Sequence, residues 1–301
     1  MKTKFYGIIP PLVTPLLDNR HLDIDGLENL IEHVVGGGVH GIFILGTTGE
    51  AQSLSFDLRA EMIRQSAKIL QKRLPLLVGI SDTSLVDSIR LAEVAAECGA
   101  DALVSAPPYY FATGQPELAD YYEKLIPQLP LPIFLYNMPM HTKVSFVPET
   151  IKRIAQNEKV IGFKDSSANG SYLQAVMYEM REHKNFSIFV GPEEMTAEGV
   201  LMGADGGVNG GANMFPRLYV DLYNAAVDQD IPKVRELQAK IMQIGRSIYT
   251  QGSYGSSALK GIKCTLNELG ICSDFVAAPF HRFESEHREK IKRALASLSI
   301  I

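Results

Sequence analysis

Short apolar runs alternate with longer amphipathic segments along almost the whole chain. Near-continuous apolar runs are typical of strands that are covered on both faces, as in a parallel sheet. The runs that predict such strands occupy residues 7–9, 41–45, 76–80, 102–106, 133–136, 160–164, 187–190 and 206–209. The segments between them have helical spacing and carry capping residues. Ser55 precedes a helix predicted over 57–70, and Gly99 follows one predicted over 85–97 as a C-cap.

Eight strands that alternate with helices predict an α/β protein with a closed (β/α)8 TIM barrel. A doubly wound open sheet is the alternative, but no G-x-G-x-x-G motif opens the first predicted helix. After Pro216 the strand pattern stops, and helices are predicted over 219–227, 232–249, 258–269 and 285–298. No Pro/Gly/Ser-rich linker separates them from the strands. We therefore predict a barrel over residues 1–225 that carries the active site, with a C-terminal helical extension over 226–301 packed on it.

Composition excludes several classes of partner. The 301 residues carry a net charge of -5, and no stripe of Lys and Arg provides a basic surface for nucleic acid. The apolar runs are too short to cross a bilayer, and the N-terminus lacks the apolar core of a secretory signal. The three cysteines are widely spaced and fit inert thiols in a reducing compartment. We expect a cytoplasmic protein that binds neither membranes nor nucleic acid.

The active site of a barrel lies at the carboxyl ends of its strands, so the polar residues that end each apolar run are the candidates for chemistry. Lys164 directly follows the apolar run over 160–163. A free lysine titrates near about 10.4, so a nucleophilic lysine must be desolvated, which an apolar barrel mouth can provide. Its amine could then condense with a ketone. The alternative is a lysine that extends from the strand end into solvent.

Two further strand ends fit the same chemistry. Tyr136 ends the preceding strand, where its phenol could carry protons to and from an iminium; the alternative is a tyrosine that caps the core. The Gly-Thr-Thr-Gly turn at 46–49 contains Thr47 and Thr48 and offers backbone N–H groups and hydroxyls to a carboxylate. An ordinary turn is the alternative there.

Glu193 and Glu194 follow the predicted strand over 187–190 and would face the far end of a substrate. Glycines nearby could suggest a phosphate site, but two adjacent carboxylates oppose a phosphate and favour hydroxyls or an amine. The alternative for either residue is a place in the first turn of a helix. The dispersed histidines form no metal-binding motif, and no Gly-x-Ser-x-Gly motif is present. We therefore expect no metal site.

The combination of these motifs resembles the dihydrodipicolinate synthase / N-acetylneuraminate lyase family of Schiff-base-forming pyruvate aldolases. The motifs are Gly-Thr-Thr-Gly-Glu at 46–50, Tyr-Tyr at 109–110, Tyr-Asn-x-Pro at 136–139 and Gly-Phe-Lys-Asp at 162–165. The resemblance runs from about Phe5 to the C-terminal helices. It implies a barrel with a C-terminal helical extension, no metal or organic cofactor, and a homo-oligomer, usually a tetramer built as a dimer of dimers.

The resemblance also implies roles for individual residues. Lys164 would form the Schiff base and Tyr136 would shuttle protons. Thr47 would relay protons between Tyr136 and Tyr110, and Tyr110 would be contributed across a dimer interface. The residues implied to bind substrate are Thr48 and Val208 for the carboxylate and carbonyl, and Gly191, Glu193 and Glu194 for hydroxyls.

Departures from the family pattern bear on the substrate. His141 stands where the synthase branch usually has an arginine for the aspartate semialdehyde carboxylate, and Gly210 where the lyase branch has a serine. The motif Lys164-Asp165-Ser166 is similar to the motif found at this place in aldolases of 2-keto-3-deoxy sugar acids. We expect reversible cleavage or condensation of a hydroxylated 2-keto acid, a 2-keto-3-deoxy sugar acid or N-acetylneuraminate, with an aldehyde as the second small molecule. The alternatives are 4-hydroxy-tetrahydrodipicolinate synthase activity and a non-catalytic keto-acid-binding barrel.

Overall fold

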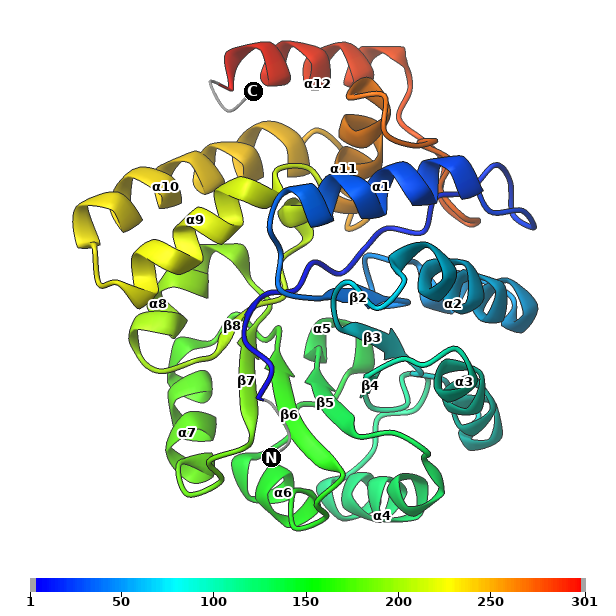
Figure 1. Ribbon diagram of the computed structural model, residues 1–301, viewed down its shortest axis with the longest axis vertical. Coiled ribbons are helices and arrows are strands. Elements are labelled where there is room, and N and C mark those ends of the chain that lie inside the picture. The colour runs from blue at the N-terminus through cyan, green and yellow to red at the C-terminus, as the bar shows by residue number, and fades with distance from the viewer. Residues whose placement is uncertain (1–3, 299–301) are drawn as a thin grey trace.

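The computed structural model describes residues 4–298, which contain eight parallel strands in one curled sheet (Figure 1). In the strand order β1-β8-β7-β6-β5-β4-β3-β2, β1 and β2 are the two end strands. The chain directly after β1 joins β2 and closes the ring, because Leu12 N–H donates to the Phe43 carbonyl at 2.8 Å and Phe43 N–H donates to the Pro10 carbonyl at 3.0 Å. The predicted barrel and its eight strands are confirmed. The strands are β1 (Gly7–Ile8), β2 (Ile42–Ile44), β3 (Leu76–Gly79), β4 (Ala102–Ser105), β5 (Ile133–Asn137), β6 (Val160–Asp165), β7 (Ser187–Val190) and β8 (Gly206–Gly207).

Helices follow the strands and cover the outside of the barrel. The predicted caps hold locally: Ser55 accepts a hydrogen bond from Leu58 N–H at 3.2 Å, and Gly99 has the positive φ of +77° that ends α3. The helices up to the last strand are α1 (Ile24–Gly36), η1 (Ala51–Ser53), α2 (Phe56–Leu70), α3 (Leu85–Glu97), α4 (Gln115–Leu125), η2 (Ile126–Gln128), α5 (Pro139–Thr142), α6 (Pro148–Ile154), α7 (Gly170–Met180), η3 (Glu193–Met195) and α8 (Thr196–Leu201).

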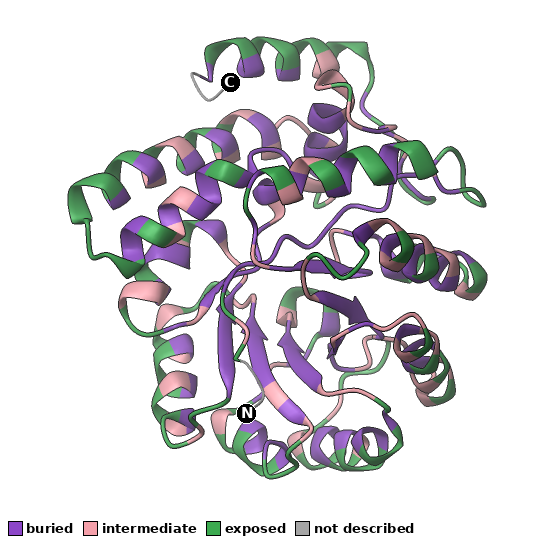
Figure 2. Ribbon diagram, viewed as in Figure 1, coloured by how far each residue is buried: buried purple, intermediate pink, exposed green. Residues whose placement is uncertain are grey.

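The strands separate two apolar cores, because successive side chains of a strand point to opposite faces. On β5, Phe134 and Tyr136 face the barrel interior, whereas Ile133 and Leu135 face the helices. The interior core also contains Ile9, Phe43, Leu77, Ala102, Val104, Ala106, Phe189 and Val208. Figure 2 shows the strands buried almost throughout and the helices buried only on their inner faces.

The chain after β8 is helical, as predicted, and consists of η4 (Gly210–Asn213), α9 (Pro216–Val227), α10 (Ile231–Ile244), η5 (Gly245–Tyr249), α11 (Ser257–Glu268) and α12 (Ser285–Ser297). The helix predicted over 232–249 differs in detail, because its last turn, η5, is a wider π-helix. The last helices form a layer along one side of the barrel (Figure 1). The division predicted between residues 225 and 226 lies in the last turn of α9 and stays a prediction. No helix within residues 4–298 has the length and apolar character that a membrane crossing requires.

Candidate active site

Lys164 lies inside the barrel at the carboxyl end of β6 and is only 6% exposed. Its register partner on β5 is Tyr136, and its Nζ lies 4.0 Å from the centroid of the Tyr136 ring. On the other side, the same Nζ is 5.5 Å from the centroid of the Phe43 ring. The lysine is therefore held between two aromatic faces, and the alternative of a side chain extended into solvent does not describe this structure.

Tyr136 is 5% exposed, and its hydroxyl lies 3.2 Å from Thr47 Oγ1. Burial raises the pKa of this phenol. The positive charge of Lys164 and hydrogen bonds with Thr47, Ser166 and Lys164 together outweigh burial, so the pKa of Tyr136 is lowered from its ordinary value. A phenol with a lowered pKa exchanges protons more readily near neutral pH. The structure thus brings Lys164, Tyr136, Thr47 and Ser166 together.

Asn137 and Asp165 are the next pair along β5 and β6 and connect the ends of these strands. Asn137 Nδ2 donates to Asp165 Oδ1 at 2.9 Å, and Ser167 Oγ donates to Asp165 Oδ2 at 2.8 Å. Burial raises the pKa of Asp165, and these hydrogen bonds partly offset that effect. Neither residue is among the site residues predicted from the sequence, although both are polar residues at the end of an apolar strand. Their contacts hold the two strand ends in register.

The turn that contains Thr47 and Thr48 is flanked by two non-glycine residues with left-handed backbone, Leu45 (φ 58°) and Glu50 (φ 56°). Gly49 passes close to the chain after β1, since a Cβ on it would lie 3.0 Å from the Leu12 carbonyl oxygen. Among the hydrogen bonds of the described residues, none uses the backbone N–H of Thr47 or Thr48. The turn therefore presents two free N–H groups and two hydroxyls beside Lys164, an arrangement suited to a carboxylate.

The ends of β7 and β8 complete the wall of the site. A Cβ on Gly191 would lie 2.0 Å from Ser166 Oγ, so only glycine lets the Ser166 hydroxyl occupy its place beside Tyr136. Val208 is 5% exposed and belongs to the same interior core as Tyr136. Both residues predicted to face the substrate at this edge are therefore next to the Lys164 cluster.

Glu193 and Glu194 have different surroundings. Glu193 is buried, and its Oε1 accepts hydrogen bonds from Gly211 N–H at 2.6 Å and from the Tyr249 hydroxyl at 2.9 Å. Its Oε2 accepts from the hydroxyls of Tyr219 and Tyr249. Burial raises the pKa of Glu193, although these hydrogen bonds act in the opposite direction. Glu194 is exposed. Of these two carboxylates, only that of Glu194 has no hydrogen bond or ion pair within residues 4–298, whereas Glu193 joins the β7 end to the C-terminal helices.

Two predicted residues lie apart from this cluster. His141, on the short helix α5, is exposed, and partial desolvation lowers the pKa of its imidazole. Tyr110 is 71% exposed and packs edge to face against Phe111. Within the described part of the single chain, no hydrogen bond joins the Tyr110 side chain to Thr47. Its contribution across a subunit interface stays a prediction. Residues 4–298 contain no group of three His, Cys, Asp or Glu side chains that could hold a metal ion.

Comparison with known proteins identifies relatives along the full length of the chain. Residues 4–298 match the Dihydrodipicolinate synthetase family. A dihydrodipicolinate synthase structure from Bacteroides thetaiotaomicron is 65% identical and superposes with a TM-score of 0.97, covering 99% of this chain and 100% of that one. A probable 2-dehydro-3-deoxy-D-pentonate aldolase of Escherichia coli K12 is 32% identical, with 99% of both chains covered. The prophage protein YagE of E. coli K12, solved with pyruvate, is 28% identical with a TM-score of 0.93 and 99% of both chains covered.

Proposed function

The chain belongs to the dihydrodipicolinate synthetase family, whose members are lyases, and from that premise we propose that Lys164 forms a Schiff base with pyruvate or another 2-keto acid. The observation that carries the proposal is the buried Lys164 amine in register with Tyr136, 4.0 Å from its ring centroid. An amine kept from water beside a proton-exchanging phenol is the arrangement that imine chemistry requires.

The reaction follows from these groups. The 2-keto acid carboxylate binds the N–H groups and hydroxyls of Thr47 and Thr48, which brings the ketone carbon to Lys164 Nζ. Lys164 attacks as the neutral amine, and the proton released from its ammonium group is transferred to the hydroxyl of the carbinolamine. Loss of that hydroxyl as water gives an iminium, which withdraws electrons from the adjacent carbon. A carbon–carbon bond at that carbon can then break or form while Tyr136 transfers the proton, with Thr47 hydrogen-bonded to the phenol.

For the second substrate we propose a hydroxylated aldehyde, so that the cleaved compound is a 2-keto-3-deoxy sugar acid or a related hydroxylated 2-keto acid. Glu194 provides an exposed carboxylate for hydroxyl groups at the edge of the site. His141 lacks the fixed charge and two-pronged geometry by which an arginine binds a second carboxylate. The aldolase name of the E. coli relative agrees with this substrate class.

The second candidate is 4-hydroxy-tetrahydrodipicolinate synthase activity, with aspartate semialdehyde as the aldehyde. It is favoured by the 65% identity to the dihydrodipicolinate synthase structure from B. thetaiotaomicron. Both candidates share the Lys164 imine and differ only in the aldehyde. None of the relatives described above is named as a non-catalytic keto-acid binder.

The proposal is tested by incubation with pyruvate and borohydride, followed by peptide mass spectrometry. We expect one reduced adduct, on the peptide that contains Lys164. Lys263 is an internal control, because it is also a buried lysine but is paired with Glu50. An unmodified Lys164 would refute the mechanism. Turnover assays with aspartate semialdehyde and with a panel of 2-keto-3-deoxy sugar acids then separate the two candidates.

A further inference from the structure

A buried ion pair connects the 46–50 loop, which contains Thr47 and Thr48, to the C-terminal helical layer. Glu50 ends this loop, and its carboxylate pairs with the ammonium group of Lys263 on α11. Glu50 is 5% exposed and Lys263 is fully buried. Two charges removed from water in this way are costly unless each is paired and hydrogen-bonded.

The remaining polar contacts of the pair all go to one segment. Lys263 Nζ donates to the Phe275 carbonyl at 2.6 Å, and Glu50 Oε2 accepts a hydrogen bond from Ala277 N–H at 2.8 Å. Residues 272–277, which we call the bracing segment, therefore contact both members of the ion pair. The bracing segment has its own supports. Ser273 N–H donates to Asp23, the N-cap residue of α1, at 2.8 Å.

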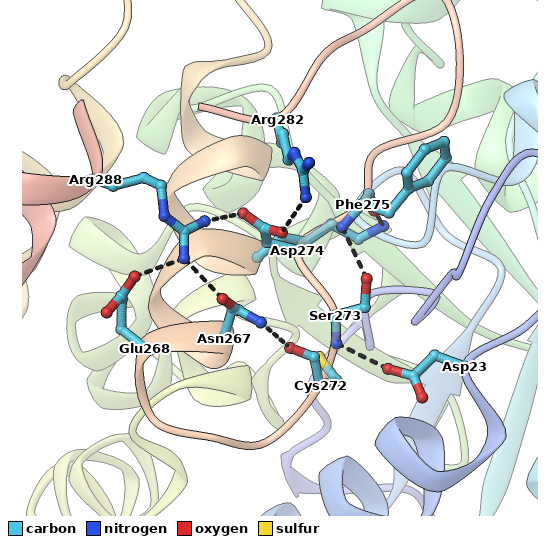
Figure 3. A network of polar contacts seen from close by, with 10 residues as sticks. Asp23, Asn267, Glu268, Cys272, Ser273, Asp274, Phe275, Arg282 and Arg288 are labelled. Carbon is cyan, nitrogen blue, oxygen red and sulfur yellow. Dashed lines mark hydrogen bonds and ion pairs between the residues drawn. The ribbon is translucent and has the colours of Figure 1, made fainter. Parts of the chain in front are cut away.

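Figure 3 shows the outer side of the bracing segment, where Asp274 meets Arg288 from α12 and Arg282. Arg288 also binds α11 through Glu268 at 2.6 Å and Asn267 at 2.7 Å. Asn267 Nδ2 in turn donates to the Cys272 carbonyl at 3.0 Å. The first part of the bracing segment is therefore tied to the C-terminal helices through Cys272, Asp274 and Phe275. Its last residue, Ala277, is tied to Glu50.

The backbone of the loop explains why such support is needed. Leu45 and Glu50 have φ values of 58° and 56°, a left-handed conformation that is unfavourable for residues with a Cβ. Such residues persist only where their surroundings hold them in place. Gly49 is held by a hydrogen bond from Thr14 Oγ1 to its carbonyl at 2.6 Å. Glu50 is held by its buried ion pair with Lys263.

We propose that Glu50, through Lys263 and the bracing segment, is a positioning residue that sets the geometry of Thr47 and Thr48 against Lys164. This inference rests on the proposed function, because it assigns the loop the task of binding the 2-keto acid carboxylate and relaying protons. It gives the C-terminal helical layer a part in the active site without contact with the substrate. It also explains why a carboxylate follows the Gly-Thr-Thr-Gly turn.

The test compares Glu50→Gln, Lys263→Met and the double variant with Leu125→Ala. Glu50→Gln keeps an acceptor for Ala277 N–H but removes the charge. Leu125 is fully buried on α4, across the barrel from the C-terminal helices, so its truncation destabilises the protein without touching the loop (Figure 1). The readouts are the pyruvate concentration that half-saturates borohydride trapping at Lys164, the turnover number, and the midpoint of unfolding.

For Glu50→Gln and Lys263→Met we expect the half-saturating pyruvate concentration to rise by about 10-fold or more, because small displacements of positioning groups have effects of this size. Turnover should fall as well, since Thr47 moves with Thr48. In the double variant the two effects should not multiply, because both residues act through one contact. Leu125→Ala should leave half-saturation unchanged at temperatures where it is folded.

An unchanged half-saturation in Glu50→Gln, or a change that Leu125→Ala reproduces at equal loss of stability, would overturn the proposal. If a single variant does not fold, the half-saturating pyruvate concentration of the double variant takes its place in the test, because the double variant leaves no unpaired buried charge. Wild-type protein without an adduct on Lys164 would refute the proposed function instead. In that case, calorimetry still measures the affinity of wild type and of Glu50→Gln for pyruvate, which reports how well the 46–50 loop binds the carboxylate. Equal affinities would overturn the role of Glu50.

Discussion

Tyr136 and Lys164 are register partners on β5 and β6, although these strands are one residue out of step at their start. Ile133 pairs with Val160, but the next residue, Phe134, pairs with Gly162, so β6 has one extra residue. A shift of one residue turns every later side chain to the opposite face of a sheet. Without the extra residue, Lys164 would face the helices and Phe163 would take its place beside Tyr136. This bulge therefore creates the proposed catalytic pair.

The first prediction concerns Gly162, the first residue of β6 that pairs with β5 after the register shift. A Cβ on Gly162 would lie 2.2 Å from the Phe134 ring and 2.5 Å from the Ser187 carbonyl oxygen. Gly162→Ala should lower the free energy of unfolding by about 1–3 kcal/mol and slow imine formation at Lys164. Gly255→Ala is the matched control, since a Cβ there meets no atom within 4 Å. Denaturant unfolding and borohydride trapping measure the two effects; equal behaviour of both variants would contradict the bulge argument.

The second prediction separates imine formation from carbon–carbon chemistry. Tyr136→Phe keeps the aromatic face beside Lys164 but removes the hydroxyl that contacts Thr47. Trapping of pyruvate should persist, whereas cleavage of the full substrate should slow by about 10²- to 10⁴-fold, the usual loss for a missing acid–base group. Tyr122→Phe is the control, because Tyr122 is a buried tyrosine that donates to the Ser105 carbonyl, outside the barrel interior. Wild-type turnover in Tyr136→Phe would show that another group carries the proton.

The third prediction concerns pH. The Lys164 charge and hydrogen bonds lower the pKa of Tyr136 in spite of its burial, so its phenolate forms below the ordinary value of about 10. If Tyr136 acts as the base, kcat/KM should rise as pH increases through this lowered pKa and fall as pH drops below it. The pH–rate profiles of wild type and Tyr136→Phe measure the effect. The same rising limb in both proteins would rule out Tyr136 as its source.

The fourth prediction distinguishes two neighbouring carboxylates. Glu194 is exposed, whereas both oxygens of Glu193 already accept hydrogen bonds from protein groups. Glu194→Gln should raise KM for a hydroxylated 2-keto acid by about 10-fold, the effect of losing one charged hydrogen bond, and leave pyruvate trapping unchanged. Glu193→Gln should change thermal stability more than KM. The reverse pattern would assign substrate binding to Glu193.

The fifth prediction addresses substrate choice at Gly210. A Cβ there would lie 3.5 Å from Glu193 Oε1 and 3.9 Å from Thr48 Oγ1, and its closest neighbour, at 3.3 Å, is the flexible end of Ile262. Gly210→Ser should therefore fold with a change of less than about 1 kcal/mol. It should raise kcat/KM for N-acetylneuraminate relative to a 2-keto-3-deoxy sugar acid, whereas Gly210→Ala should not. An equal ratio in both variants would exclude this position as a determinant of substrate class.

Much of the fold was predictable from short stretches of sequence. All eight strands were found because a parallel strand covered on both faces is apolar along its length, a property of a few consecutive residues. The N-cap Ser55 and the left-handed Gly99 are local signals of the same kind. Lys164, Tyr136 and Thr47 could be proposed because each lies at or just after the carboxyl end of an apolar run, and the carboxyl ends of parallel strands meet at one face of a barrel.

The partners of the buried polar groups were decided by the tertiary structure. The contacts of Glu193 with Tyr219 and Tyr249, and of Glu50 with Lys263, join residues that are far apart along the chain. Composition and spacing describe how buried a residue will be, but not which distant group will satisfy its charge. The extra residue in β6 is likewise invisible in an apolar run, because register depends on the neighbouring strand. The sequence alone determined the barrel and the candidate residues at its mouth, and folding determined their register and the contacts that hold them.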